Sequence, residues 1–320
     1  MNSMFEDLLK RKETGIVLAA ALLFLIFSVT SKSFLTMYNL FNIARTLSLY
    51  VFIALAQVMA IVVGGMNLSV GAIGGLATIA TGYVFDILGF SGWVAVPAAI
   101  LAGLAAGALN GLLITKLGIN SFIVTLSTLF VFEGLVNGIS RGYSYTKIPE
   151  SFTIIGRQGI FGLPYLFWLA LLTLGVVFYL FRFTVFGRRL LATGGNEDAA
   201  RLSGINTKQI IFFANMLSGF FAAAAAILWV SRMGSAQPST GQDWLIISFA
   251  VAIIGGTGLK GGTVTPLGLL MGGIIMVLIK NGLVLLGTNI YFERTFYGLI
   301  ILLAVVVDRV QAIYSVRSKR

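Results

Sequence analysis

The chain has 320 residues, of which 58% are hydrophobic and only 10% are charged, and its mean hydropathy is +0.97. These values lie far outside the range of soluble globular proteins and indicate an integral membrane protein. The absence of Cys and His excludes disulfides, thiol nucleophiles, imidazole bases and Cys/His metal centres. The net charge of +11 indicates membrane topology rather than nucleic-acid binding, because the charges lie at the ends of apolar runs.

Apolar runs long enough to cross a bilayer, about 20 residues, recur along the chain. The first follows a basic start, and we interpret it as an uncleaved span because no small-residue cleavage site follows it. The eighth run is short and is followed by glycines. A non-helical, glycine-rich segment can lie within the membrane only where protein or water forms hydrogen bonds with its backbone groups. The runs predict an all-α integral membrane protein with a single domain over residues 1–320. The ten predicted spans cover residues 15–29, 47–63, 70–88, 94–114, 122–139, 163–181, 210–230, 245–254, 264–286 and 296–307.

The positions of Lys and Arg predict how these spans are oriented. With the N-terminus in the cytoplasm, fourteen of the 22 basic residues fall on the cytoplasmic side, seven fall outside, and Lys280 lies within a span. Membrane proteins carry an excess of Lys and Arg in their cytoplasmic loops. We therefore predict about ten spans with both termini in the cytoplasm.

The longest interior stretch too polar for a bilayer lies between the sixth and seventh predicted spans. We predict that residues 186–209 form a cytoplasmic loop that contains a short helix. Asn196 is a suitable N-cap, acidic residues follow in the first turn, where the helix dipole favours negative charge, and Gly204 can end the helix. The pair Gly194–Gly195 is expected to set this helix at an angle to the preceding span.

Two glycine-rich segments, 64–71 and 255–262, share the pattern Gly-Gly-x-x-Leu-x-x-Gly, and each lies between two apolar runs. Transporters are often built from duplicated halves that carry interrupted segments in matching positions. In a chain with 38 glycines the match can equally arise by chance. Duplication and coincidence therefore both stay open.

The sequence carries no convincing nucleotide-binding site. Residues 256–261 fit G-x-G-x-x-G, but no acidic residue occurs between Asp243 and Glu293, so the acidic partner of a dinucleotide site is missing. No G-x-x-x-x-G-K-[ST] loop occurs in the chain. We therefore predict that the chain is not an enzyme, and that any ATP that drives it is hydrolysed by another polypeptide.

Polar side chains inside the predicted spans are candidates for contact with a solute. Glu133 and Asn137 are four residues apart and therefore share one helix face. Ionisable groups at membrane depth are costly and often functional. Glu133 could instead form a structural ion pair with Lys280, or hydrogen bonds that only hold helices together. Asn67 and Ser69 are weaker candidates, with hydrogen bonds between helices as the alternative.

Six segments carry a family resemblance: GGMNLSVG at 64–71, NGLLITKLGINSFIVTLST at 110–128, FGRRLLATGGNEDAARLSGI at 186–205, GSAQP at 234–238, GGTGLKGG at 255–262 and NGLVLLG at 281–287. Together they resemble the permease subunits of ribose-type sugar ATP-binding-cassette importers, in the branched-chain amino acid/ribose permease superfamily. The resemblance extends over about residues 15–308 and implies a type II architecture, similar to that of the vitamin B12 importer. Asn67 replaces the usual Asp of that family, which leaves a hydrogen-bonding role but not a charged one.

The resemblance implies a subunit that translocates a monosaccharide, such as a ribose-type pentose or a hexose, across the cell inner membrane. The implied partners are a cytoplasmic ATPase, a periplasmic or lipid-anchored sugar-binding protein, a second permease copy or paralogue, and membrane lipid, with no nucleic acid. The chain itself is expected to bind no cofactor and no metal, since ATP and Mg are used by the ATPase. The short helix in 186–209 is expected to be the coupling helix that contacts the ATPase.

An ion-coupled secondary carrier for a small polar solute is the alternative function. It would use Glu133 as a coupling site and would not need a polar cytoplasmic helix, while a channel or structural membrane protein would need neither. The expected ATPase-coupling residues are Gly195, Asn196, Glu197, Asp198, Ala200, Arg201, Leu202 and Gly204. The expected pathway residues are Asn67, Ser69, Glu133 and Asn137.

Substitutions at two positions follow as expectations from the sequence. A bulky charged residue at Ala200 is expected to uncouple ATP hydrolysis from transport while leaving insertion intact. Asn67→Leu is expected to slow transport without harming assembly, whereas Asn67→Asp is expected to be tolerated.

Overall fold

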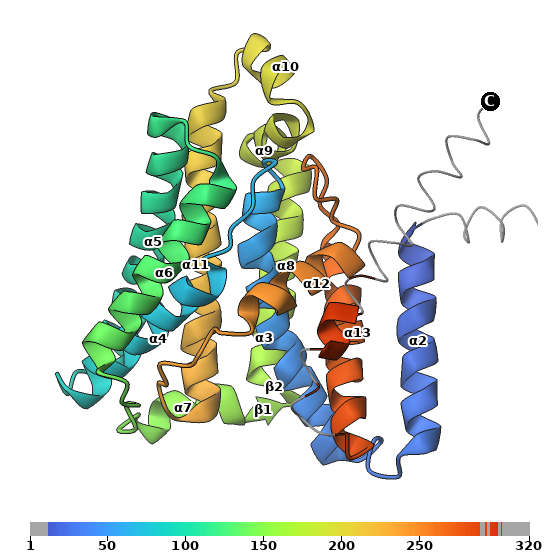
Figure 1. The fold of residues 1–320 in the computed structure, drawn as a ribbon. Coiled ribbons are helices and arrows are strands. Elements are labelled where there is room, and N and C mark those ends of the chain that lie inside the picture. Colours follow the sequence, from blue (N-terminus) through green and yellow to red (C-terminus); the bar gives the residue numbers. More distant parts are fainter. Residues whose placement is uncertain (1–11, 289–291, 293–294, 300–301, 303–320) are drawn as a thin grey trace, which may run out of the picture.

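The computed structural model describes residues 12–288, 292, 295–299 and 302, which are mostly helical (Figure 1). A hairpin of two short antiparallel strands, β1 (Gly159–Ile160) and β2 (Leu163–Pro164), accompanies the helices. The helices are α2 (Lys12–Thr30), α3 (Met37–Ile61), α4 (Val70–Asp86), α5 (Gly92–Leu117), α6 (Ser121–Ser140), α7 (Glu150–Arg157), α8 (Tyr165–Phe183), α9 (Val185–Gly195), α10 (Glu197–Leu202), α11 (Thr207–Met233), α12 (Trp244–Ile254) and α13 (Pro266–Leu285).

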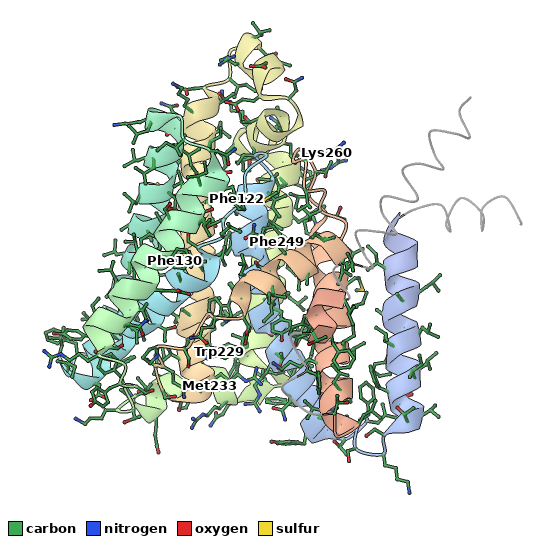
Figure 2. All side chains as sticks on the ribbon, viewed as in Figure 1. Phe122, Phe130, Trp229, Met233, Phe249 and Lys260 are labelled. Carbon is green, nitrogen blue, oxygen red and sulfur yellow. The ribbon has the colours of Figure 1, made fainter. Side chains whose placement is uncertain are left out.

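The long helices run between two ends of the molecule. Helix α10 forms the tip of one end, and α7 with the β-hairpin lies at the other (Figure 1). We call these the α10 end and the α7 end. Lys260, between α12 and α13, lies at the α10 end, and Met233, the last residue of α11, lies at the α7 end (Figure 2). The connecting segments thus fall on two opposite sides, as expected for a chain that crosses a membrane repeatedly.

Helix α3 forms the centre of the bundle. Every residue from Leu47 to Ile61 is buried, and the helix packs against α8, α11, α12 and α13. A helix that is apolar around its whole circumference is suited to this central position.

Small residues bring α5 and α11 into backbone contact. A Cβ atom on Gly103 would overlap the carbonyl of Gly219, and a Cβ atom on Gly107 would overlap the carbonyl of Asn215. Membrane helices associate through such close van der Waals packing, because lipid tails provide no hydrophobic drive between helices. The high glycine content of the chain is used, in part, for this helix packing.

Six of the described helices are long and apolar enough to cross a bilayer, namely α3, α5, α6, α8, α11 and α13. Residues 15–30 of α2, together with α4 and α12, form three shorter apolar helices. The first nine predicted spans each coincide with one of these nine helices. Most of the tenth, 296–307, lies outside the described residues. The total of ten spans and the cytoplasmic termini stay predictions.

The polar loop differs from the expected geometry because it contains an additional helix, α9, before α10. The Thr184 side chain caps this helix by accepting a hydrogen bond from the Gly187 amide (3.0 Å). Gly194 and Gly195 are the last residues of α9 and do not link α10 directly to the preceding span. The turn between α9 and α10 lies at Asn196, whose backbone is extended.

The two glycine-rich segments end α3 and α12 in the same way. Gly64 and Gly256 both adopt left-handed backbone conformations, with φ of +81° and +77°. In each case the following amide donates to the carbonyl five residues earlier, at 3.0 and 2.9 Å, which is the Schellman closure of a helix. The left-handed glycine is the first of the pair 64–65 but the second of the pair 255–256. The two helix ends are therefore offset by one residue from the shared sequence pattern.

Candidate coupling helix and solute cavities

Helix α10 forms where the capping pattern predicts it. The Asn196 side-chain oxygen accepts a hydrogen bond from the Ala199 amide (2.9 Å), which is the N-cap interaction. Glu197 and Asp198 occupy the first turn, where the helix dipole favours negative charge. Gly204 follows the helix with a φ of +81°, which glycine adopts without strain. The predicted short helix is confirmed, and its role stays a prediction.

The outward face of α10 presents one large apolar side chain beside an ion pair. Leu202 is 89% exposed. Arg201 donates to the carboxylate of Asp198 at 2.6 Å, and both side chains are largely exposed. Exposed ion pairs contribute little stability by themselves, about 0–1 kcal/mol. This face is therefore free to contact another protein.

Two of the residues that were expected to contact an ATPase also make contacts within their own chain. Ala200 is only 5% exposed. Glu197 accepts a hydrogen bond from the Thr207 hydroxyl (3.1 Å) at the start of α11. A bulky charged residue at position 200 would have to be buried against the chain itself, at a high desolvation cost. This substitution should therefore destabilise the packing of α10, while the expectation that it leaves insertion intact stays a prediction.

Closely packed glycines join α9 and α10 to the bundle. The Gly262 amide donates to the Val62 carbonyl (3.0 Å), which connects the segment after α12 to the segment after α3. A Cβ atom on Gly194, at the end of α9, would overlap both of these groups. A Cβ atom on Gly261 would likewise overlap the Gly64 backbone and the Gly194 carbonyl. We call this contact among Val62, Gly64, Gly194, Gly261 and Gly262 the glycine junction.

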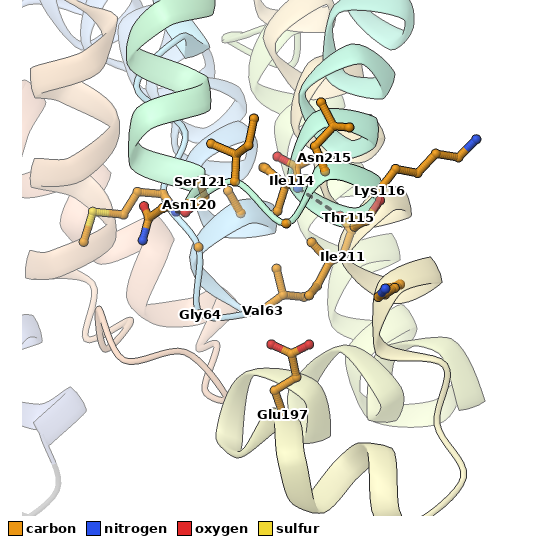
Figure 3. A pocket seen from close by; sticks show the side chains of 17 residues that line it. Val63, Gly64, Ile114, Thr115, Lys116, Asn120, Ser121, Glu197, Ile211 and Asn215 are labelled. Atoms are coloured by element: carbon orange, nitrogen blue, oxygen red, sulfur yellow. Dashed lines mark hydrogen bonds between the residues drawn. The ribbon is translucent and has the colours of Figure 1, made fainter.

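A first cavity, of about 440 Å³, opens beside the glycine junction at the α10 end (Figure 3). The Glu197 side chain points into it from α10, while Asn120 and Ser121 approach it from the start of α6. Asn215 of α11 also lines it, and the Oδ1 atom of this residue is buried without a hydrogen-bond partner among the described residues. The rest of the wall comes mainly from residues 63–66 and 114–119.

A second cavity, of about 510 Å³, lies between α4, α6 and the segment before α12. Glu133 and Asn137 both line it, so their expected placement on one face is confirmed. Ser239, Thr240 and Gln242 line it from the other side. The cavity thus combines one carboxylate with several amide and hydroxyl groups, which suits a solute with many hydroxyl groups.

The expected structural ion pair between Glu133 and Lys280 is not formed. Glu133 lies on α6 and Lys280 on α13, which lie on opposite sides of the central helix α3 (Figure 1). Glu133 makes no ion pair with any residue in the described part of the chain. Its carboxylate is therefore available to a molecule in the second cavity.

Asn67 and Ser69 belong to a buried hydrogen-bond network. The Asn67 amide nitrogen donates to the Ser218 hydroxyl (2.8 Å), and its side-chain oxygen accepts from the amide (3.0 Å) and the hydroxyl (2.7 Å) of Ser69. Asn110 donates to the Ser69 hydroxyl (2.9 Å), and Thr128 donates to Asn110 (2.8 Å). These five residues, which we call the polar network, connect the segment before α4 to α5, α6 and α11.

This placement corrects the expected role of Asn67 and Ser69. Both are fully buried and line neither cavity, so their observed contacts are those of the alternative, hydrogen bonds between helices. Along α6, Ser121 lines the first cavity, Thr128 belongs to the polar network, and Glu133 lines the second cavity. The polar network thus lies at a level between the two cavities.

A multi-pass helical bundle with polar cavities at two levels and an exposed helix at one end has the architecture of a membrane transport permease. The model of the family described as "Branched-chain amino acid transport system / permease component" matches residues 39–305. The chain belongs to this family of permease components.

Curated relatives include sugar permeases of similar length. The chain is 34% identical over 300 residues to the ribose import permease protein RbsC of Escherichia coli, covering 91% of this chain and 92% of the relative. It is 34% identical over 301 residues to the ribose import permease of Bacillus subtilis, covering 93% of each. It is 35% identical over 309 residues to the L-arabinose transport system permease protein AraH of Escherichia coli, covering 96% and 92%.

The fold is also similar to a solved transporter structure. This structure is described as an inward-facing conformation of a putative metal-chelate type ABC transporter. The TM-score is 0.55 at 18% sequence identity, and the match covers 93% of this chain and 98% of the other. At this level of identity the likeness concerns the fold alone.

Proposed function

We propose that this chain is the translocation subunit of an ATP-binding-cassette importer that carries a monosaccharide across the cell inner membrane. Its ribose and L-arabinose permease relatives support a pentose or a related sugar as the cargo. A separate cytoplasmic ATPase hydrolyses MgATP, since this chain has no P-loop. An exported sugar-binding protein delivers the sugar, and a second permease copy or paralogue completes the complex.

The exposed helix α10 is the observation that carries this proposal. A partner protein that buries a side chain as exposed as Leu202 gains about 1.5–3 kcal/mol of binding free energy. The neighbouring pair of Arg201 and Asp198 adds charges of both signs for polar contacts. A protein that binds here gains a central apolar contact with a polar rim, as in other protein interfaces.

The glycine junction mechanically connects α9 and α10 to the wall of the first cavity. Closely packed backbones transmit displacement, because protein interiors have low compressibility. When the ATPase shifts α10, the end of α9 presses on Val62 and Gly262, which lie in the segments after α3 and α12. Residues 63–66 of the first of these segments also line the first cavity. ATP-driven motion at α10 therefore changes the shape of this cavity.

The second cavity serves as a contact site for the sugar on its way through the complex. A sugar is neutral and rich in hydroxyl groups, so it needs hydrogen-bond partners that replace water. Asn137, Thr240 and Gln242 supply such partners, and Glu133 accepts hydrogen bonds from sugar hydroxyls.

The proposed energy source predicts how uptake responds to ATP and to ion gradients. In vesicles that contain the permease, its ATPase and a sugar-binding protein, uptake of radiolabelled ribose or L-arabinose should require ATP inside the vesicle. It should persist when ionophores collapse the proton and sodium gradients. Uptake that follows an imposed ion gradient without ATP would instead establish the ion-coupled carrier.

Glu133→Leu should reduce the efficiency of uptake, which is the maximal rate divided by the half-saturating sugar concentration, by about 10- to 100-fold. The reason is that a hydrogen bond to a charged group is worth about 1.5–3 kcal/mol. Glu133→Gln keeps a neutral acceptor, whose hydrogen bond is worth about 0.5–1.5 kcal/mol, so the efficiency of uptake should fall by only about 5- to 10-fold. The measurement is the initial rate of uptake against sugar concentration, per assembled complex. Glu150→Gln, on α7 and outside both cavities, is the matched control. Complete loss of uptake with Glu133→Gln would indicate proton coupling instead.

A further inference from the structure

A third cavity, of about 920 Å³, lies between α4 and α6 in the half of the bundle toward the α7 end. Its walls are mainly apolar side chains, joined by three tyrosines and one arginine. Leu76 and Ile87 mark its extent along α4 and are about 16 Å apart at 1.5 Å per residue. One leaflet of a bilayer has a similar depth, since the whole hydrocarbon core is about 30 Å thick. The third cavity therefore has the length of the acyl chains in one leaflet.

The third cavity opens to the surroundings of the bundle. Ile87 at the end of α4 and Ile139 on α6 both line it, and these side chains are 57% and 46% exposed. Gly138 of α6 also lines it, and a Cβ atom there would meet no atom within 4 Å. Helices α5 and α6 form the edge of the bundle farthest from α2 (Figure 1). In a multi-pass membrane protein the molecules that surround such an apolar opening are lipids.

The polar groups of the third cavity lie at the ends of α4 and α6, where a lipid headgroup would be. Arg141 directly follows the last residue of α6, and Tyr143 follows two residues later. Tyr83 lies in the last turn of α4. Tyrosines are enriched at the membrane–water interface, and long arginine side chains reach from apolar surface to the headgroups. The apolar part and the polar part of the cavity thus follow the order of a phospholipid.

The charge of the third cavity favours an anionic headgroup. Arg141 is exposed, and among the described residues it forms no ion pair. Asp86, at the end of α4, is already paired with Lys147 (3.3 Å). None of the described residues that line the cavity is an Asp or a Glu. An ammonium headgroup would therefore find no carboxylate there, whereas a phosphate without an ammonium group would find a free guanidinium.

The segment 141–145 is a wall shared by the third cavity and the second cavity. Its residues alternate between the two: the third cavity is lined by Arg141, Tyr143 and Tyr145, and the second by Gly142 and Ser144. The backbone of Tyr145 pairs with that of Ala236, with both hydrogen bonds at 2.9 Å. A molecule that fills the third cavity therefore packs against the wall of the second.

We propose that the third cavity binds one anionic phospholipid, with an acyl chain between α4 and α6 and the headgroup phosphate at Arg141. The bound lipid supports the segment 141–145 and so holds the adjacent wall of the second cavity in place. The lipid site depends only on insertion of the chain into a membrane. Its effect on sugar uptake rests on the proposed function, in which the second cavity contacts the sugar.

The test of the headgroup site uses the full permease–ATPase complex in nanodiscs of equal parts phosphatidylcholine and phosphatidylglycerol. Native mass spectrometry of the released complex counts the bound lipids of each kind. Arg141→Gln should lower the preference for phosphatidylglycerol about fivefold, because one basic residue near a membrane surface contributes about that factor. Lys32→Gln is the matched control, since it removes an exposed charge from the turn between α2 and α3 at the same end. This variant should keep the preference of wild type.

The test of the acyl-chain site uses leucine substitutions on α6. Gly138→Leu fills the third cavity without a clash and should lose the bound lipid of either kind. Gly134→Leu, one turn earlier, also meets no atom within 4 Å at its Cβ but lies outside the cavity, and it should keep the lipid. Melting temperature should stay unchanged in Gly134→Leu and in Arg141→Gln. Sugar uptake by wild type should increase with the phosphatidylglycerol content of the vesicles, and this increase should be smaller in Arg141→Gln.

An unchanged lipid preference in Arg141→Gln would overturn the inference, and so would full retention of lipid by Gly138→Leu. If Gly138→Leu kept its lipids but separated two permease copies, the third cavity would be a contact between copies instead. Normal ATP-driven uptake by wild type alongside any of these results would leave the proposed function intact. Lipid binding as expected in a complex that transports no sugar would contradict the proposed function and leave the lipid site standing.

Discussion

Leu202→Asp should nearly abolish ATP-driven uptake while leaving the permease folded. The side chain is 89% exposed, so the substitution removes no internal contact, and exposed substitutions of this kind usually change stability by about 0.5 kcal/mol or less. An ATPase that covers Leu202 would lose about 1.5–3 kcal/mol of apolar burial and would also have to desolvate a carboxylate. Its affinity should therefore fall by at least about tenfold, since each 1.4 kcal/mol is a factor of ten.

The measurement for Leu202→Asp is the dissociation constant of the ATPase for purified permease, together with ATP-driven uptake. Phe161→Asp is the matched control, because Phe161 is 86% exposed but lies between β1 and β2 at the opposite end. This variant should bind the ATPase as wild type does. Normal ATPase affinity and uptake in Leu202→Asp would show that α10 is not the ATPase contact.

Asn67→Leu should destabilise the permease by about 2–6 kcal/mol, because it leaves two buried groups of the polar network without a partner, at about 1–3 kcal/mol for each one. These groups are the Ser69 amide and the Ser218 hydroxyl, while the Ser69 hydroxyl loses its acceptor but still accepts from Asn110. The structure therefore reverses the expectation that this variant assembles normally. The measurement is the thermal melting and the yield of the purified complex.

Asn67→Asp is the matched control for the polar network. A carboxylate at this position can accept from both Ser69 donors, and the Ser218 hydroxyl can rotate to donate as well. The loss of stability should therefore be much smaller than with leucine. If Asn67→Leu melted like wild type while uptake fell, Asn67 would be a pathway residue, and the structural role assigned to the network would be wrong.

The sequence by itself determined the protein class, the positions of the first nine apolar helices and the existence of helix α10. Hydropathy is a local property, and crossing a bilayer imposes a length that a run of residues either meets or does not. The cap at Asn196 and the left-handed stop at Gly204 are also local, because their hydrogen bonds span only a few residues. The shared face of Glu133 and Asn137 follows from helical periodicity in the same way.

The tertiary structure alone decided which of these local features meet. Asn67 and Ser218 are 151 residues apart, and no periodicity indicates that they bond to each other rather than to a solute. The glycine pairs at 64, 194 and 261 are visible in the sequence, but their contact depends on how α3, α9 and α12 pack. Packing sets these contacts because it depends on the shapes of whole helix surfaces, which distant parts of the chain complete.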